Sequence, residues 1–294
     1  LRSLVGSEMC IRDRHGGWLV AVPGTDELDE GLFGLSTAGR GIALAVRAYL
    51  QQGGVENYRE LLRMLGDHLL SLGLGYRDPV PQPRTGFYHP RFGTLEEWLA
   101  ARDGTRPAIG LLFYRSFFLS GDLAFVDALV AAGERLGADV LPVYGYSLKD
   151  DPDASGRTAV LRALCDSDGK LLVDVIVNTM AFALGNAGGA GEGPDWQVSV
   201  MEELGIPQVQ GIALSTTVEQ WAASVTGAGP LDVAMSVAIP ELDGRIIGVP
   251  TSFKERERDG TIRRVVPADR AERLMGLAVR LARLRRLPNG EKRV

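Results

Sequence analysis

Five polar residues follow apolar segments of the chain and are candidate contacts to a ligand. Arg115 and Ser116 come directly after one apolar run, and Asp122 closes the turn behind them. Asn178 and Lys254 follow two later runs. An arginine can bind a carboxylate through two parallel hydrogen bonds, whereas a lysine contributes a compact positive charge. Such residues also cap helices and shape loops: both roles stay open for Arg115 and Lys254, and capping is favoured for serines and threonines.

The first apolar run is predicted to be a strand of a parallel sheet. Residues 108–114 are apolar throughout and too few for a typical helix, which indicates a strand buried on both faces. A polar turn, a helical pattern over 120–137 and a second apolar run at 140–144 come next. Residues 106–150 therefore form a predicted strand–helix–strand unit, whose crossover should be right-handed.

The alternation of strands and helices continues along the chain. Helices are predicted at 158–164, 196–204, 217–224 and 268–286, and strands at 173–177, 208–212 and 245–249. This order predicts an α/β fold with a doubly wound, mostly parallel sheet of the Rossmann-like or flavodoxin-like kind. Ligands of such sheets bind outside the carboxyl ends of the strands, where the strand order reverses. The five polar residues are therefore expected at one edge of the sheet.

A helical segment is predicted before the sheet. Helical spacing is present at 37–52, 55–72 and 94–101, and residues 18–22 are predicted to be a strand. His89 precedes a proline, which favours a turn-fixing role for its side chain. We expect the chain to have four parts. Residues 1–14 are a non-native segment that is similar to translated adapter sequence at the edges of metagenomic gene models. Residues 15–104 are mainly helical, 105–266 form the α/β domain, and 267–294 form a helix that leads into a missing domain.

Composition excludes several classes of function. With 45% hydrophobic and 23% charged residues, the 294-residue chain has the composition of a soluble globular protein. A net charge of −5 gives no bulk attraction to nucleic acid, and no apolar run is long enough to cross a bilayer. Two cysteines are too few for a disulfide framework or a thiolate metal site, which fits a reducing cytoplasm. The three histidines lie far apart and show no metal-ligand spacing. The glycine-rich stretch 185–193 lacks the Gly-Lys-Ser/Thr ending of a nucleotide-binding loop.

Five segments resemble, in order, the CobN and magnesium-chelatase large-subunit family. They are RPAIGLLFYRSFFLSGD, DVIVNTMAFALG, IPQVQGIALSTTVEQW, PLDVAMSVAIPELDGRIIGVPTSFKE and RAERLMGLAVRLARLRRLPNGEKRV, and the resemblance covers residues 18–294. It implies an internal fragment of the tetrapyrrole-binding subunit of a metal chelatase, an enzyme that forms nitrogen–metal bonds. Separate AAA+ partner subunits would hydrolyse ATP, and the fragment alone should be inactive. No catalytic residue is predicted within it.

The resemblance also favours one branch of the family. GTDELDEGLFGLSTAGR and ELDGRIIGVPTSFKE are similar to the cobalt-chelating branch, whose reaction inserts cobalt(II) into hydrogenobyrinic acid a,c-diamide in aerobic cobalamin biosynthesis. The magnesium branch, which acts on protoporphyrin IX in chlorophyll biosynthesis, stays an alternative, as does a non-enzymatic α/β small-molecule-binding protein. Arg115, Ser116, Asp122, Asn178 and Lys254 are then the candidate contacts to the corrinoid or porphyrin. At Phe117 relatives often carry histidine, so no ligand role is inferred there.

Overall fold

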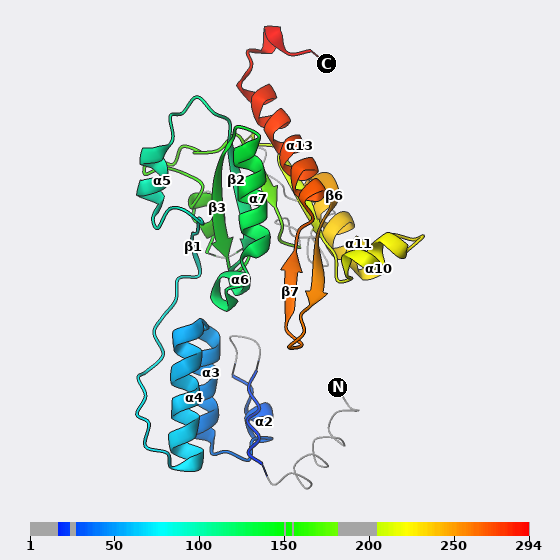
Figure 1. Ribbon diagram of the computed structural model, residues 1–294. Helices are drawn as coiled ribbons and strands as arrows, with labels where there is room; N and C mark the ends of the chain where they lie inside the picture. Colours follow the sequence, from blue (N-terminus) through cyan, green and yellow to red (C-terminus); the bar gives the residue numbers. More distant parts are fainter. Residues whose placement is uncertain (1–16, 24–27, 150, 155, 182–204, 294) are drawn as a thin grey trace, which may run out of the picture. The chain divides into compact units, whose positions relative to one another are not determined.

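The computed structural model describes residues 17–23, 28–149, 151–154, 156–181 and 205–293. It divides into two compact units, Leu1–Pro83 and Arg84–Val294 (Figure 1). Each unit has buried hydrophobic clusters of its own, and each is described here by itself. The helix expected at 196–204, the glycine-rich stretch 185–193 and the segment 1–14 lie outside the described residues.

Helices form the described core of the first unit. They are α2 (Glu30–Phe33), α3 (Arg40–Gln52) and α4 (Val55–Leu70). Gly53 and Gly54 join α3 to α4 and both have positive φ, a conformation that glycine adopts without steric cost. The facing sides of α3 and α4 bury Val46, Tyr49 and Met64. The predicted helices at 37–52 and 55–72 are thereby confirmed, with ends shifted by two or three residues at most.

The strand predicted at residues 18–22 is wrong. Its main chain is bonded to side chains of the loop between α2 and α3: the Leu19 N–H donates to Thr37 Oγ1 at 2.7 Å, and the Ala21 N–H donates to Ser36 Oγ at 2.9 Å. Hydroxyl groups thus take hydrogen bonds that a neighbouring strand would otherwise supply, and the segment belongs to no sheet among the described residues.

The second unit contains a seven-stranded sheet with the order β1-β3-β2-β4-β5-β6-β7 among the described residues. Its strands are β1 (Thr85–Phe87), β2 (Ala108–Tyr114), β3 (Asp139–Gly145), β4 (Val175–Asn178), β5 (Gln208–Ala213), β6 (Ile246–Arg256) and β7 (Ile262–Val265). Strands β2 to β6 are parallel, whereas β1 and β7 are antiparallel to their neighbours at the two edges. The predicted mostly parallel sheet is confirmed.

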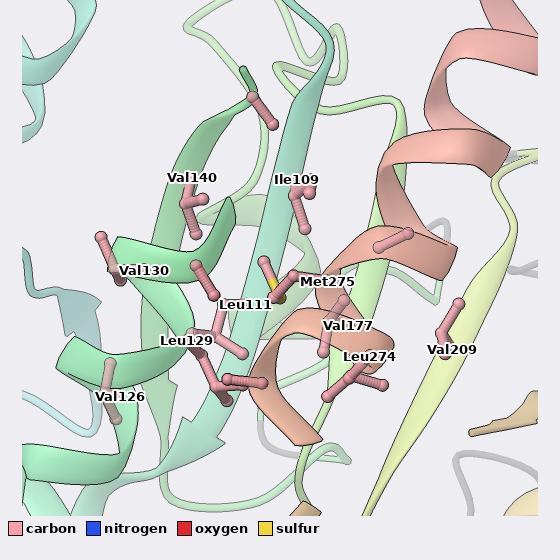
Figure 2. Packing of buried hydrophobic residues seen from close by; sticks show 14 of the residues in the cluster. Ile109, Leu111, Val126, Leu129, Val130, Val140, Val177, Val209, Leu274 and Met275 are labelled. Carbon is pink, nitrogen blue, oxygen red and sulfur yellow. The ribbon is translucent and has the colours of Figure 1, made fainter. Parts of the chain in front are cut away.

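Helices lie on both faces of this sheet. On one face α7 (Ala124–Arg135) and α13 (Ala268–Arg286) pack on alternate residues of the strands, as Figure 2 shows for Ile109, Leu111 and Val177. On the other face Leu112 and Ile176 contact a second cluster that includes residues of α5 (Leu95–Ala101) and α8 (Ala159–Arg162). This two-sided burial explains why the central strands are apolar throughout.

Several elements differ from the expectation. Where a polar turn was predicted after β2, helix α6 (Arg115–Ser120) begins at once, and Gly121, with a φ of +71°, caps its C-terminal end. Between β5 and β6, α10 (Val218–Ala223) is followed by α11 (Pro230–Val233), the π-helix η1 (Ala234–Ala238) and α12 (Ile239–Leu242). Pro240 has no N–H and its ring crowds the preceding turn, which accounts for the widened π turn. The short 3-10 helix η2 (Asn289–Glu291) follows α13.

The strand order fixes where a ligand would bind. Numbered by their order in the chain, the five parallel strands β3-β2-β4-β5-β6 have the order 2-1-3-4-5, which is the flavodoxin-like arrangement. The chain winds outwards from β2 in one direction to β3 and in the other to β4. The reversal point of this doubly wound sheet therefore lies between the carboxyl ends of β2 and β4.

Candidate functional site at the carboxyl edge of the sheet

Arg115 lies at the reversal point because α6 begins directly after β2. Leu112 and Asn178 are register partners on β2 and β4, and Arg115 is three residues beyond Leu112. The residue is buried, with 6% of its surface exposed. Burial raises the pKa of Tyr144, on the neighbouring strand β3, and the positive charge of Arg115 acts in the opposite direction. The structure therefore places a guanidinium in a poorly hydrated position at this edge.

Asn178 is the last residue of β4 and is fully buried. Its Oδ1 accepts a hydrogen bond from the Met180 N–H at 2.9 Å, whereas its Nδ2 has no hydrogen-bond partner among the residues that the structure describes. The next residue, Thr179, donates from both its N–H and its Oγ1 to the Leu112 carbonyl, at 3.0 and 2.8 Å. Leaving a buried donor unpaired costs about 1–3 kcal/mol. The Nδ2 group is one of several buried side-chain atoms without a hydrogen-bond partner among the described residues, and it lies at the end of a central strand.

A buried polar network holds the residues that follow Asn178. Arg245, just before β6, donates to Asp243 at 2.7 Å, to Gln210 Oε1 at 2.7 Å and to the Met180 carbonyl at 3.2 Å. Gln210 Nε2 also donates to the Met180 carbonyl, at 3.3 Å. Burial lowers the pKa of Arg245, and the adjacent Asp243 carboxylate opposes this shift. Side chains from β5 and from the turn before β6 thus hold the main chain at Met180, two residues after the end of β4.

Tyr114 completes the network from the other side. Its hydroxyl donates to the Ala181 carbonyl at 3.1 Å, so β2 also holds the chain beyond β4. Burial raises the pKa of Tyr114, and Arg245 is close enough to act against this rise. Sequence analysis missed Tyr114, Gln210, Asp243 and Arg245. The available signal was two polar residues, Tyr114 and Gln210, in otherwise apolar strand patterns, together with the acid–base pair on either side of Gly244.

Asp122 has a partner far along the chain. The main-chain N–H of Arg264, on β7, donates to its carboxylate at 3.1 Å. The guanidinium of Arg264 donates to Ser252 Oγ at 2.8 Å and lies over the ring of Phe117, with 5.7 Å between the Arg264 Cζ and the ring centroid. Asp122 therefore joins the loop between α6 and α7 to the β6–β7 hairpin.

Ser116 and Lys254 are exposed, unlike Arg115 and Asn178. Lys254 is the register partner of Arg264 in the β6–β7 hairpin, and its N–H donates to the Thr216 carbonyl at 3.0 Å. Strand β6 is the third strand from β2 in the sheet order. The structure thus brings Arg115 and Asn178 to the ends of adjacent strands and places Lys254 on the hairpin.

A separate pocket lies within the first unit. It has a volume of about 330 Å³, an apolar floor that includes Ile42 and Met64, and His68 and Tyr76 among its lining residues. The His68 Nε2 and the Tyr76 hydroxyl share a hydrogen bond of 2.7 Å. None of the five residues predicted from the sequence lines this pocket, so it is not the predicted site.

Two further features concern metals and membranes. Across the part of the chain that the structure describes, no three His, Cys, Asp or Glu side chains are grouped in a way that could hold a metal ion. In the same residues, none of the helices has the length and apolar character needed to span a bilayer.

These observations describe a doubly wound α/β domain with buried polar groups at the reversal point, the position used by ligand-binding domains of this class. Comparison with known sequences extends this to a family. The family model described as CobN/Magnesium Chelatase matches residues 47–294, and the chain belongs to this family.

Individual relatives come from both branches of the family. The chain is 34% identical to the aerobic cobaltochelatase subunit CobN of Pseudomonas aeruginosa over 288 residues, which cover 95% of this chain and 22% of the relative. It is 30% identical to the chloroplastic magnesium-chelatase subunit ChlH of Oryza sativa subsp. japonica over 264 residues, covering 82% of this chain and 18% of the relative. The chain therefore spans about a fifth of the length of these relatives.

A solved structure shows the same fold. The catalytic subunit of cobaltochelatase from Mycobacterium tuberculosis matches with a TM-score of 0.72 and 36% sequence identity, over 99% of this chain and 23% of the other. At this identity the likeness extends beyond fold to family. The resemblance noted from the five sequence segments is thus confirmed.

Proposed function

We propose that the chain is a segment of the large, tetrapyrrole-binding subunit of a cytoplasmic cobaltochelatase. The observation that carries the proposal is the match of 34% identity over 95% of this chain with an aerobic cobaltochelatase subunit CobN, against 30% over 82% with a magnesium-chelatase subunit ChlH. The substrates would be cobalt(II) and hydrogenobyrinic acid a,c-diamide, and AAA+ partner subunits would hydrolyse the ATP that drives insertion.

In this proposal the carboxyl edge of the sheet holds rim carboxylates of the macrocycle. Arg115 supplies a guanidinium that can bind a carboxylate through two hydrogen bonds in a poorly hydrated position. Asn178 supplies a donor on the adjacent strand, and the exposed Ser116 and Lys254 contact the ligand from the rim. Asp122 orients the β6–β7 hairpin through Arg264. Such contacts hold the macrocycle while the metal sheds its water.

The test is ligand titration of the full-length subunit, followed by quenching of tryptophan fluorescence. Wild type should bind hydrogenobyrinic acid a,c-diamide more tightly than protoporphyrin IX. Arg115→Ala should weaken corrinoid binding about 10- to 100-fold, because a hydrogen bond to a charged group is worth about 1.5–3 kcal/mol. Arg135→Ala is the matched control, since Arg135 is exposed on α7 and pairs with Glu272.

The possible results separate the candidate functions. Tighter binding of protoporphyrin IX would assign the chain to the magnesium branch, to which the Oryza sativa relative belongs. Corrinoid binding without cobalt insertion, in the presence of the ATPase subunits, would favour a non-enzymatic binding protein. Equal affinities of wild type and Arg115→Ala would remove Arg115 from the site.

A further inference from the structure

The end of β4 has a donor that the described part of the chain does not use. Asn178 is fully buried, its Oδ1 is bonded to the Met180 N–H, and its Nδ2 has no partner among the described residues. Buried side-chain polar atoms nearly always have a partner, from the protein, from ordered water or from a ligand. An oxygen acceptor from a bound ligand would therefore complete this site.

The residues around this donor are held rigidly. Thr179 is bonded twice to β2, the Met180 carbonyl accepts from Arg245 and Gln210, and the Ala181 carbonyl accepts from Tyr114. The Arg245–Asp243 pair at the centre of this network has no exposed side-chain surface, and its two charges compensate each other. A network of this kind costs desolvation, and fixing one local geometry is an attested use of such buried pairs.

We propose that Asn178 Nδ2 donates a hydrogen bond to a ligand carboxylate at the β2–β4 edge, and that the Arg245–Asp243 pair is the positioning element that holds Asn178 for this contact. The inference deepens the proposed function and rests on it for the identity of the ligand. The Cα of Arg115 lies three residues past the register partner of Asn178, about 10 Å along the strand direction. Its positive charge favours an anionic ligand at this edge of the sheet, and the carboxylate at Asn178 Nδ2 follows from the ligand of the proposed function.

The first variant is Asn178→Asp in the full-length subunit. Its carboxylate still accepts from the Met180 N–H but replaces the Nδ2 donor by an oxygen, which repels a ligand carboxylate. Binding of hydrogenobyrinic acid a,c-diamide should weaken at least 10-fold, and binding of its fully methylated ester should weaken less. Asn289→Asp, on the exposed helix η2, makes the same change of charge and should bind both probes like wild type. Wild-type affinity for the acid in Asn178→Asp would overturn the proposal and assign the Nδ2 donor to an internal water.

The second variant tests positioning and covers the case in which Asn178→Asp fails to fold. Arg245→Met combined with Asp243→Leu removes both buried charges together, an exchange that proteins often tolerate without loss of stability. The double variant should melt near the wild-type temperature, exchange the Met180 amide proton at least 10-fold faster, and bind the corrinoid more weakly. Wild-type exchange at Met180 would overturn the positioning role. If wild type binds neither tetrapyrrole, the proposed function fails, and the exchange measurement still decides whether Arg245 and Asp243 position the turn.

Discussion

His89 shows how a single side chain can carry a pH-dependent contribution to stability. Its ring is buried, its Nδ1 accepts from the Arg91 N–H at 3.2 Å, and its Nε2 lies 3.4 Å from Glu134 Oε1. Burial, and next the positive charge of Arg91, lower the pKa of His89 to about 4. The bond to Arg91 confirms the turn-fixing role predicted from the sequence, because it closes the loop two residues after the histidine.

Acidification should therefore destabilise the second unit through His89. The folded protein holds the ring neutral down to about pH 4, whereas the unfolded chain takes up the proton near pH 6.5. The stabilising contribution is complete above pH 6.5 and is lost as the pH falls from 6.5 towards 4, with an upper limit of about 3 kcal/mol. His89→Asn, whose Oδ1 can still accept from Arg91, should show a shallower fall in Tm between pH 7 and pH 5. Parallel curves for the two proteins would contradict this assignment.

At the scale of elements, the contact of α7 with the sheet depends on a glycine. A Cβ built at Gly133 would lie 2.6 Å from Val140 Cγ2 on β3 and 2.8 Å from Met275 Cε on α13. Figure 2 shows Val140 and Met275 in this cluster. The methionine end can move, but the β-branched valine is stiff and is held in its strand. Glycine at this position lets helix and sheet approach closely.

Gly133→Ala should consequently destabilise the second unit by about 1–3 kcal/mol through overpacking, despite the gain in helix propensity. The matched control is Gly276→Ala on α13, where the nearest atom to the added Cβ is the flexible end of Arg280 at 3.5 Å. That change should raise stability by about 0.5–1 kcal/mol. Thermal unfolding of both variants, followed by circular dichroism, measures the difference. Equal or inverted effects would show that α7 can shift away from β3 without cost.

At the scale of the whole molecule, the boundary between the compact units is at Pro83 and Arg84. The second unit has large buried clusters on both faces of its sheet, whereas the described part of the first is built around the buried side chains of Val46, Tyr49, Leu61 and Met64. The boundaries at 104/105 and 266/267 that we expected from the sequence stay a proposal for the domain organisation of the chain.

Residues 84–294, expressed alone, should fold and unfold cooperatively, because a chain of this length buries enough apolar surface for independent stability. Its Tm should lie within a few degrees of the main transition of the 294-residue chain. Calorimetry compares the two directly. A broad, non-cooperative transition of residues 84–294 would mean that the sheet depends on the first unit.

Local sequence determined much of the secondary structure. The apolar run at 108–114 is strand β2, and the periodic segment after Pro267 is helix α13, with the predicted ends. The helix predicted at 217–224 is α10, and Thr217 and Gln220 form a capping box at its start. In each case the deciding interactions join residues close in the chain, so composition and spacing carry the information. The family resemblance followed from the same local segments.

Only the tertiary structure decided which residues meet. The resemblance and the α/β pattern left the strand order open, and that order alone places Arg115 beside the end of β4. The partner of Asp122 is 142 residues away, and Arg245 reaches Met180 across 65 residues. Asn178 was predicted as a ligand contact. The sequence could not show that its Oδ1 accepts a hydrogen bond from the Met180 N–H while its Nδ2 has no partner among the described residues. Such facts depend on the burial and pairing of strands distant in the chain, which no local pattern encodes.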